Sequence, residues 1–570
     1  IREFPYILKT QCPKNINNIK TKVNVFLDFN CCIHGCVNIL NNNIKEGIIK
    51  PPIKTTQDFE SLLIKNIIEY IDLIYNTTKP TGLFYISIDG IPPYSKIIQQ
   101  RNRRYINAWK SMRLQDAINK HNNCNNNHKI EHVELFDRCK ISPGTDFMKI
   151  LSNKISEHLS KLHLSHTHKC SKLYLSDSLK EGEGEFKIFK KLNKNKYKNY
   201  INSIYGLDAD LFMLSLLSSC HNIYLMREPI HLKLARNITN SNSIQEFQFI
   251  FIDIAEFRTN IQNNYARYFG INCDKTNTIN NSQNDCNDNI IKYYVFLCFI
   301  LGNDFIPHLS FIHLKHEGHE LLLETYKSVF YELHDNNQDN CHIIIINNQL
   351  LYKYKINYIF LIKLIEKLSY IEDKEYHDQS NKYFEKIPYN KNFSKDEYIA
   401  KFKYELENYP LIMNMIAKNA NTFNTNTNIN NYTYKIDIGV DSGWRSRYYH
   451  YLFRTHNGKD INDICHNYLE SLQFTLDYYY HQKYKTNMTW YYRFNYSPTI
   501  LDLNNYLILL STMDHNDINE YIINSMNDQK LYPSINITIP LQLMIILPIK
   551  NSKSEIIIMS KCDDKQDEFL

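Results

Sequence analysis

Seven carboxylates in this chain stand shortly after apolar segments, at points where a polypeptide leaves the interior of a fold. They are Asp28, Asp89, Glu183, Glu185, Asp208, Asp210 and Asp304. An aspartate that follows a strand is usually the N-cap of the next helix, so one such residue alone indicates little. Carboxylates that meet at one place would repel one another strongly unless some were protonated or bound to cations. Bound cations are the simpler arrangement, and the pattern therefore predicts a metal site.

The ligand atoms indicate which metal this site would hold. Carboxylate oxygens suit Mg²⁺ or Mn²⁺, hard ions that retain water ligands and bind phosphate oxygens, whereas a zinc site would use histidine and cysteine. Glu183 and Glu185 are two positions apart, as are Asp208 and Asp210, and residues at that spacing point the same way in extended backbone. Two such ions commonly promote the in-line attack of water on a phosphodiester. Phosphodiester hydrolysis is therefore the predicted reaction class.

A basic segment follows Asp89 closely. Its polar residues Lys96, Gln100, Arg103 and Arg104 would share a sector of about 100° on a helix. Such a stripe is often only a solvated helix face. The neighbouring carboxylates favour a binding role instead, because arginine forks and a lysine ammonium together fix the orientation of a terminal phosphate.

Short apolar segments alternate with segments of helical periodicity in the first part of the chain. The predicted strands are residues 23–27, 83–88, 173–175, 202–205 and 222–226. Residues 59–75 and 147–162 place apolar side chains at helical spacing. This alternation predicts an α/β fold with a mainly parallel sheet flanked by helices. Ligands of such sheets bind beyond the carboxyl ends of the strands, where the carboxylates stand.

A chain of 570 residues exceeds what one hydrophobic core supports, and we expect several units. A second helical, aromatic-rich unit is expected to pack on the core and to complete the active-site pocket. The predicted parts are an α/β nuclease core at 1–334 with Asn-rich insertions near 121–128 and 272–289, a helical linker region at 335–434, the second unit at 435–550 and a charged tail at 551–570.

Composition narrows the class of protein. Hydrophobic residues make up 43% of the chain, which excludes a wholly disordered protein. Lys and Arg number 66 against 60 Asp and Glu, so a nucleic acid would have to be held by a local basic patch. The 14 cysteines are dispersed and no signal peptide or membrane span stands out. We expect a soluble, monomeric, intracellular protein without a membrane partner. A cytoplasmic location is expected, and a nuclear one stays open.

These segments together resemble the XRN-type 5′-to-3′ exoribonuclease family. The first six matching segments occur in the family's order at 27–34, 88–104, 143–148, 182–187, 205–210 and 301–308. Further matches occur in the second half at 443–449, 478–480, 490–492 and 540–548. The sequence departs from the family pattern at Lys180-Glu181, at Phe186 and at Met488. The resemblance covers nearly the whole chain.

The resemblance implies a processive, Mg²⁺-dependent enzyme that hydrolyses single-stranded RNA bearing a 5′-monophosphate to nucleoside 5′-monophosphates. By position, the seven carboxylates would hold two Mg²⁺ ions, with Mn²⁺ as an alternative. The 5′-phosphate pocket would comprise Lys96, Gln100, Arg103 and Arg104. His34 and Trp490 would stack on the leading bases. A closed pocket sized for one phosphate would exclude a cap or a triphosphate sterically.

Two other functions remain open from the sequence. A flap-endonuclease-like DNA nuclease could share the α/β architecture and the metal, although the basic helix and the aromatic second unit disfavour it. A catalytically inactive RNA-binding scaffold is also possible. It is disfavoured because a scaffold has no need to concentrate seven carboxylates.

Overall fold

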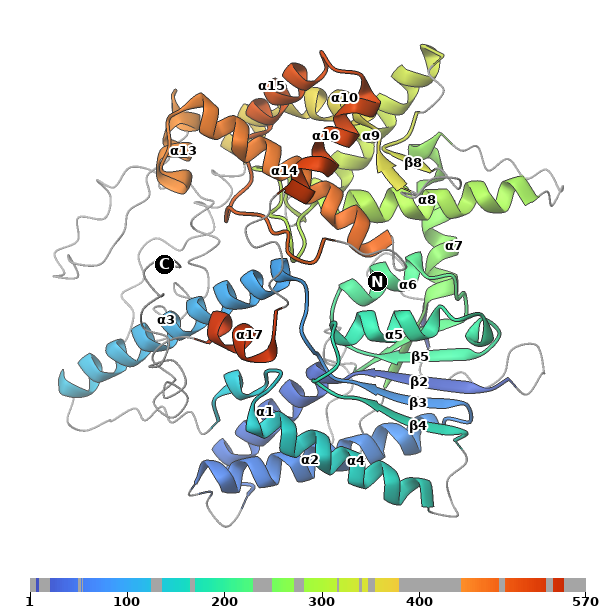
Figure 1. Cartoon of the computed structure of the whole chain (residues 1–570), viewed down its shortest axis with the longest axis vertical. Helices are drawn as coiled ribbons and strands as arrows, with labels where there is room; N and C mark the ends of the chain where they lie inside the picture. Colours follow the sequence, from blue (N-terminus) through green and yellow to red (C-terminus); the bar gives the residue numbers. More distant parts are fainter. Residues whose placement is uncertain are drawn as a thin grey trace. The chain divides into compact units, whose positions relative to one another are not determined.

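The computed structural model divides the chain into two compact units. The first unit comprises residues 1–93, 133–264 and 534–570, and the second comprises 94–132 and 265–533. Each unit is assembled from distant parts of the sequence (Figure 1). The residues that the structure describes are 7–9, 21–49, 53, 55–124, 136–164, 170–228, 249–270, 281–314, 317–337, 341–346, 354–378, 442–480, 487–528 and 537–547.

A seven-stranded sheet forms the centre of the first unit, in the order β1-β7-β6-β5-β2-β3-β4. The strands are β1 (Leu8–Lys9), β2 (Val23–Asp28), β3 (Leu83–Ser87), β4 (Lys172–Ser176), β5 (Ile201–Tyr205), β6 (Ile223–Arg227) and β7 (Ile250–Asp253). Strands β2 to β6 pair in parallel, whereas β7 runs antiparallel to β6 and to β1. All five predicted strands are present, and the predicted mainly parallel sheet is confirmed.

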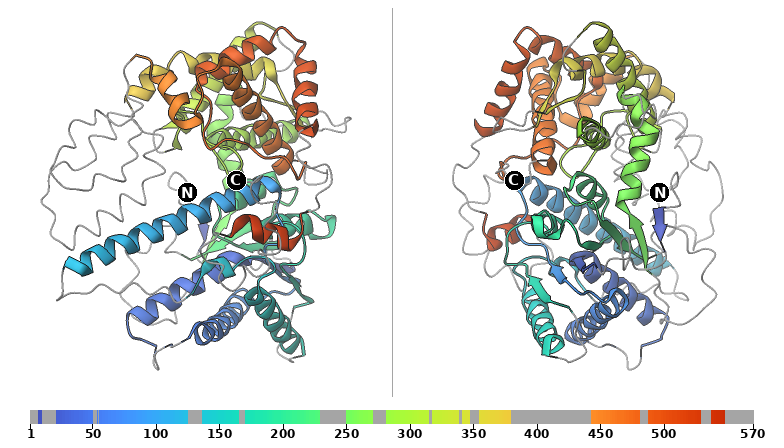
Figure 2. Two further views of the ribbon diagram at one scale, coloured as in Figure 1. Left: turned by 60° about the vertical axis from the view of Figure 1, so that its left-hand side comes forward. Right: turned by 90° about the vertical axis from the view of Figure 1, so that its right-hand side faces the viewer.

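Helices cover both faces of this sheet. The described α-helices of the first unit are α1 (Phe29–Lys45), α2 (Thr56–Thr78), α4 (Asp146–Leu164), α5 (Gly184–Leu192), α6 (Asp210–Leu217), α7 (Ile254–Tyr265) and α17 (Ile539–Ile546). On one face α1, α2 and α4 pack against alternate strand residues such as Val25 and Leu27. On the other face α5 packs on β2 and β3 (Figures 1 and 2). Successive side chains of β2 therefore point alternately into two separate layers of packing, one on each face of the sheet.

Local sequence explains where these helices begin. Thr55 caps α2: its hydroxyl accepts from the Asp58 N–H at 3.1 Å, and the Asp58 carboxylate accepts from the Thr55 N–H at 3.0 Å. This reciprocal pair satisfies two backbone donors at the helix start. Buried residues such as Phe59, Leu63 and Ile67 then recur at helical spacing, so that one face of α2 enters the core.

The second unit is mainly helical and rich in buried aromatic rings, as predicted. Its described helices are α3 (Tyr94–Cys124), α8 (Asn281–Ile300), α9 (Gly318–Asp335), α10 (Tyr358–Ser369), α13 (Trp444–Phe453), α14 (Gly458–Tyr480), α15 (Ile500–Leu510) and α16 (His515–Asp528). The hairpin β8 (Ile344–Ile346) and β9 (Tyr354–Ile356) packs on α14. Phe299 stacks on Tyr479 with ring centroids 4.2 Å apart. Within the described residues no helix is both long and apolar enough to cross a membrane.

Two Asn-rich stretches that we predicted as insertions are partly helical. Helix α3 continues to Cys124, and α8 begins at Asn281. Asparagine disfavours a helix by less than about 1 kcal/mol per residue relative to alanine, so an established helix can continue through it. The rest of both stretches, residues 379–434 of the predicted linker region and the predicted tail lie outside the described residues.

Candidate active site

The carboxyl ends of the parallel strands bring acidic residues to one edge of the sheet. Asp28 is the last residue of β2 and pairs in register with Ser87 of β3. Asp89 follows β3 by two residues, and Gly206 directly follows β5. Because β2, β3 and β5 are neighbouring parallel strands, residues that follow them leave the sheet at the same edge.

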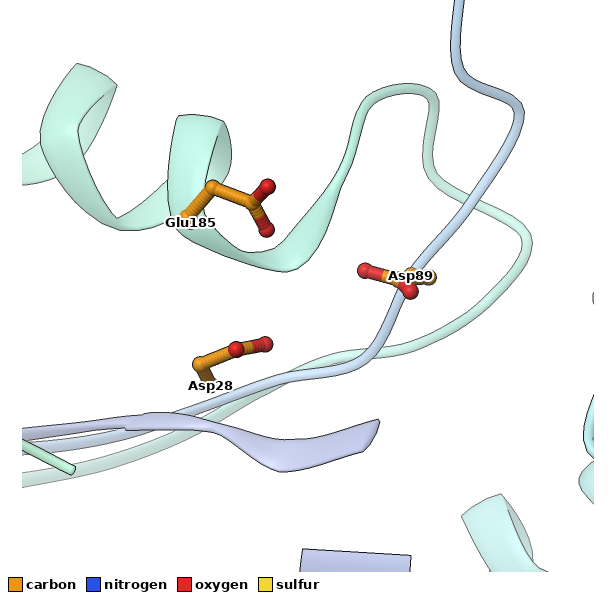
Figure 3. Close-up of side chains that lie close together, drawn as sticks. All are labelled: Asp28, Asp89 and Glu185. Carbon is orange, nitrogen blue, oxygen red and sulfur yellow. The ribbon is translucent and has the colours of Figure 1, made fainter. Parts of the chain in front are cut away.

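Three carboxylates meet at this edge and form what we call the acidic trio: Asp28, Asp89 and Glu185. One oxygen of each lies within 4.8 Å of the others, and Figure 3 shows the three side chains pointing toward one another. Asp28 is 3% exposed and Glu185 is 4% exposed, whereas Asp89 is half-buried. Glu185 belongs to the first turn of α5, so a helix N-terminus faces the other two carboxylates, a position that favours negative charge.

Gly184 makes this close approach possible. A Cβ atom added there would lie 2.6 Å from Asp28 Oδ1 and 3.2 Å from Asp89 Oδ1. The Gly184 N–H donates to Asp89 Oδ1 at 2.7 Å, and Ser87 Oγ donates to the Gly184 carbonyl at 2.9 Å. The glycine thus lets the backbone of α5 act as a hydrogen-bond donor within the trio.

Two further residues, Asn30 and Lys187, surround Asp89, and neither was predicted from the sequence to have a role. Asn30 Nδ2 donates to Asp89 Oδ2 at 2.7 Å, and Asn30 Oδ1 accepts from the Asp89 N–H at 3.2 Å. The Lys187 ammonium donates to the carbonyls of Ile88 at 2.8 Å and Asp177 at 3.0 Å. Burial lowers the pKa of Lys187 to about 8, and the nearby Asp89 carboxylate opposes that change. In the sequence, the only indication of a role was that Asn30 and Lys187 lie within the matching segments 27–34 and 182–187.

The donor set of the trio fits a hard divalent cation. Three largely buried carboxylates at this separation cannot all be charged without a compensating cation nearby. They offer oxygen atoms only, which suit Mg²⁺ or Mn²⁺ and do not suit a soft metal. The Gly184 N–H and the Asn30 amide donate to the Asp89 carboxylate and keep it oriented, as such donors do in metal sites generally.

The other predicted ligands of the first unit are outside the trio. Glu183 is 3% exposed and is the N-cap residue of α5. Asp210 begins α6 and is half-buried, while Asp208 precedes it and is exposed. Gly206 begins the loop that carries Asp208, and it lies next to the trio, since a Cβ added at Gly206 would be 3.3 Å from Asp28 Cβ. The ligand roles of Glu183, Asp208 and Asp210 stay predictions.

The seventh carboxylate lies in the second unit, where it contacts the basic helix α3. Asp304 forms an ion pair with Lys96 and accepts a hydrogen bond from Gln99 Nε2 at 3.2 Å. Lys96 is 9% exposed. Asn303 shapes the Asp304 turn by accepting from the backbone N–H groups of Phe305 and Ile306. The structure therefore brings Asp304 to a predicted phosphate-binding residue, and it adds Gln99, one position before the predicted Gln100.

The remaining residues of the predicted phosphate pocket line the same helix. Gln100 and Arg104 are half-buried, and Arg103 is exposed. The loop that follows residue 487 contacts this helix: the Tyr94 N–H donates to the Met488 carbonyl at 2.8 Å, and the rings of Tyr94 and Tyr491 meet edge to face. The start of α3 is thus held within the second unit.

The two predicted stacking residues differ in exposure. His34 lies in α1 and is half-buried. Trp490 is 1% exposed, stacks on Phe474 with ring centroids 4.7 Å apart, and donates from Nε1 to Glu470 Oε2 at 3.2 Å. A ring that stacks on a base needs an open face, so the burial of Trp490 conflicts with its predicted role. Here the indole is a core residue of the second unit.

Comparisons with known proteins cover most of the chain. Residues 1–229 match the family described as "XRN 5'-3' exonuclease N-terminus", and residues 285–512 match the one described as "Xrn1 helical domain". The first match contains the acidic trio, and the second contains Asp304 and Trp490.

Curated relatives carry names that agree with these families. The "5'-3' exoribonuclease 1" of Homo sapiens is 26% identical over 506 residues, which are 85% of this chain and 27% of that protein. The protein of that name from Saccharomyces cerevisiae is 25% identical, covering 84% of this chain and 35% of its own length. The "5'-3' exoribonuclease 2" of Arabidopsis thaliana is 24% identical, with 84% and 53% covered. The chain thus spans between about a quarter and about half of these relatives.

Proposed function

Because this chain belongs to the XRN family of 5′-to-3′ exonucleases, we propose that it is an exoribonuclease that hydrolyses RNA from the 5′ end. The observation that carries the proposal is the acidic trio of Asp28, Asp89 and Glu185 at the carboxyl edge of a parallel sheet. Relatives named exoribonucleases match 84% or 85% of the chain. The proposed products are nucleoside 5′-monophosphates, released processively.

The proposed cofactor is Mg²⁺, with Asp28, Asp89 and Glu185 as the residues that would hold it. A bound divalent ion would stabilise negative charge on the phosphodiester and lower the pKa of an attacking water. Asn30 and the Gly184 N–H orient Asp89 from two sides. The ammonium of Lys187 stands beside the same carboxylate and offsets part of the negative charge. Glu183, Asp208 and Asp210 of the same unit are proposed as further ligands of a two-ion site, and the ligand role of Asp304 stays a prediction from the family resemblance.

Helix α3 supports the proposed preference for a 5′-monophosphate. Lys96, Gln100, Arg103 and Arg104 follow one another along it at helical spacing, and a lysine with two arginines would match the charge and geometry of a phosphate dianion. Lys96 is already oriented by its contact with Asp304. We further propose that the protein acts on single-stranded RNA as a monomer, and that it is cytoplasmic; imaging of the tagged protein would test its location.

A comparison of 5′ ends tests this function. One RNA would be prepared with a 5′-monophosphate, a 5′-triphosphate or a cap, and incubated with the protein in Mg²⁺ or in EDTA. We expect rapid release of nucleoside 5′-monophosphates from the first RNA only, and only with Mg²⁺. Asp28→Asn should abolish this release while RNA binding persists. Equal decay of all three RNAs would contradict the phosphate pocket, and cleavage of DNA flaps alone would contradict the proposed substrate.

A further inference from the structure

A row of aromatic rings crosses the sheet of the first unit toward its outer strand. Phe26 of β2 pairs in register with Tyr85 of β3, which pairs with Tyr174 of β4. The ring centroids are 5.9 Å apart in the first pair and 5.3 Å in the second, where the rings are parallel. Strand β4 is the last strand of the sheet on this side (Figure 1). The row therefore ends at a half-buried tyrosine at the sheet edge.

Lysines from three different elements gather around that tyrosine. The Lys180 ammonium lies 4.8 Å from the centroid of the Tyr174 ring, that of Lys191 4.9 Å and that of Lys172 5.8 Å. Lys180 also donates to the Tyr174 hydroxyl at 2.9 Å. Exposed Lys194 lies two residues after the end of α5. We call these residues the Tyr174 patch: Tyr174, Lys172, Lys180, Lys191 and Lys194.

Asp177 acts on Lys180, but the other three lysines of the patch concentrate positive charge without a recorded acidic partner in the described part of the chain. No ion pair recorded among the described residues includes Lys172, Lys191 or Lys194. Burial lowers the pKa of Lys191, and the charges of Lys194 and Lys172 lower it further. Like charges held together in this way destabilise a fold, and they create a local potential that attracts anions.

Protection of the sheet edge would explain only part of this arrangement. Lysines on an outer strand block its pairing with another chain, and Lys172 of β4 fits that role. Lys191 belongs to the last turn of α5, and Lys194 to the turn that follows it. Neither of these two residues is on the edge strand. A surface that binds a polyanion accounts for all of them together.

The patch lies on the same face of the sheet as the acidic trio and close to it. Asp28 is two residues after Phe26 on β2, so both side chains point to the face covered by α5. Asp28 pairs in register with Ser87 of β3, which pairs with Ser176 of β4. Tyr174 is two residues before Ser176. With strands about 4.8 Å apart and about 3.3 Å per residue, Tyr174 lies roughly 12 Å from Asp28 along the sheet.

We infer that the Tyr174 patch binds the phosphate backbone of the RNA substrate, downstream of the nucleotide that is being removed. The lysine ammonium groups cover the Tyr174 ring, so the patch presents cations to phosphates and not a bare ring to bases. Backbone contacts of this kind tolerate any sequence and suit a strand that moves through the enzyme. The inference rests on the proposed function, because it takes RNA as the substrate.

Binding measurements with two lengths of RNA test the inference. The variant K172Q/K191Q/K194Q removes three charges and leaves Lys180, which adjoins the loop of the trio, in place. The matched control is K149Q/K154Q/K161Q, which removes three exposed lysines from α4 of the same unit. Fluorescent oligouridines of about 4 and about 30 nucleotides, at the lower limit of and well above ordinary single-strand site sizes, would be titrated with each protein in EDTA over a range of salt concentrations.

The patch variant should bind the long RNA on the order of tenfold more weakly than wild type at physiological salt. Its plot of log Kd against log salt should be shallower by about 2, at ~0.7 per lost phosphate contact on a single strand. Binding of the short RNA and all binding by the control should stay within about twofold of wild type. Lys194→Glu, at an exposed position, provides a second variant should the triple substitution lower the melting temperature.

Other outcomes separate this inference from the proposed function. Unchanged long-RNA affinity in a folded patch variant, while wild type binds and degrades RNA, would overturn the inference alone. Wild type that neither binds nor degrades RNA would overturn the proposed function first. A labelled polyglutamate peptide that binds through these lysines, with no change in RNA binding, would replace RNA by an acidic protein partner and would also overturn the inference.

Discussion

Asn30 orients Asp89 through both of its amide atoms, one to the carboxylate and one to the backbone N–H. Asn30→Ala removes both contacts and leaves the metal-binding oxygens less well oriented. Loss of a group that orients a metal ligand typically costs about 10- to 100-fold in metal affinity or activity. We expect that loss both in turnover of 5′-monophosphorylated RNA and in the affinity for Mg²⁺, measured by calorimetry.

Asn38 provides the matched control for that substitution. It lies in the same helix, α1, and its amide oxygen accepts from Arg138 at the surface, at 2.7 Å. Asn38→Ala should leave both turnover and Mg²⁺ affinity within about twofold, because a surface hydrogen bond contributes little. Equal losses in the two variants would mean that Asn30 acts on the stability of α1 and not on Asp89.

Trp490 should contribute to stability. Its indole is packed on Phe474 and hydrogen-bonded to the buried Glu470. Trp490→Ala should lower the free energy of unfolding by about 3–5 kcal/mol, as expected for a large buried ring, measured by chemical denaturation followed by circular dichroism. Trp490→Phe keeps most of the ring and should cost less than half as much. A stable Trp490→Ala variant that binds RNA poorly would restore the stacking role.

At the scale of the element, helix α5 depends on a glycine at its first position. In Gly184→Ala the new methyl group would meet Asp28 Oδ1 at 2.6 Å, so the trio must open. A misplacement of about 1 Å can cost roughly 100-fold in rate, and we expect a loss of that order in RNA turnover. Gly35→Ala in α1 is the control, because among the described residues no atom beyond its chain neighbours and its own helix backbone lies within 4 Å of the added Cβ.

The two glycine variants should differ in stability as well as in activity. Gly35→Ala should stabilise α1 by about 0.5–1 kcal/mol through helix propensity, with no effect on turnover. Gly184→Ala should lose turnover whether or not its melting temperature falls. Wild-type turnover in Gly184→Ala would show that the trio tolerates the added methyl group, and the close approach at Gly184 would then have no catalytic meaning.

The elements that could be predicted from the sequence are those with a local pattern. The buried strands β2 and β3 are mainly apolar and end on or near Asp28 and Asp89, and α4 shows its buried side at helical spacing. Parallel pairing then places strand ends at one edge, which is why the acidic site could be anticipated. The contact between Gln99 and Asp304 could not be anticipated, since residues 96, 99 and 100 share a helix face and only the packing of a distant turn selects among them.

The burial of Trp490 could not be predicted from the sequence either. Its neighbours Phe474 and Glu470 belong to α14, and nothing local distinguishes a tryptophan that covers such a helix from one that faces a substrate. Asn30 and Lys187 belong to recognisable motifs, yet Asn30 bonds to a residue 59 positions away, and one of the two partners of Lys187 is 99 positions away. Long-range contacts of this kind require the fold to be known.

At the scale of the whole molecule, the small net charge of +6 conceals strong local contrasts. The first unit places three carboxylates together at the sheet edge and lysines around Tyr174. The second unit places Lys96, Arg103 and Arg104 along α3. Local fields decide how a polyanion binds, since charges separated by more than roughly 8 Å are largely screened at physiological ionic strength. Binding of RNA should therefore depend steeply on salt despite the modest net charge.

Stability of the second unit should depend on pH through His342. This histidine lies against the rings of Tyr293 and Phe330, and burial lowers its pKa to about 4. In the unfolded chain this histidine binds a proton below its ordinary pKa of about 6.5. In the folded chain it does so only below about pH 4. The free energy of unfolding should therefore fall by up to about 3 kcal/mol as the pH decreases through this window.

Tryptophan fluorescence can follow that change selectively, because all three tryptophans, Trp109, Trp444 and Trp490, belong to the second unit. Denaturant unfolding would be measured between pH 4 and 7 for wild type and for His342→Gln, which keeps a hydrogen-bonding group beside the Tyr326 hydroxyl but does not titrate. Other acidic groups contribute equally to both proteins, so the difference between the two curves isolates His342. We expect the free energy of unfolding of wild type to fall steadily relative to that of His342→Gln from pH 6.5 toward pH 4. Parallel curves would mean that the histidine is protonated in the folded protein as easily as in the unfolded chain.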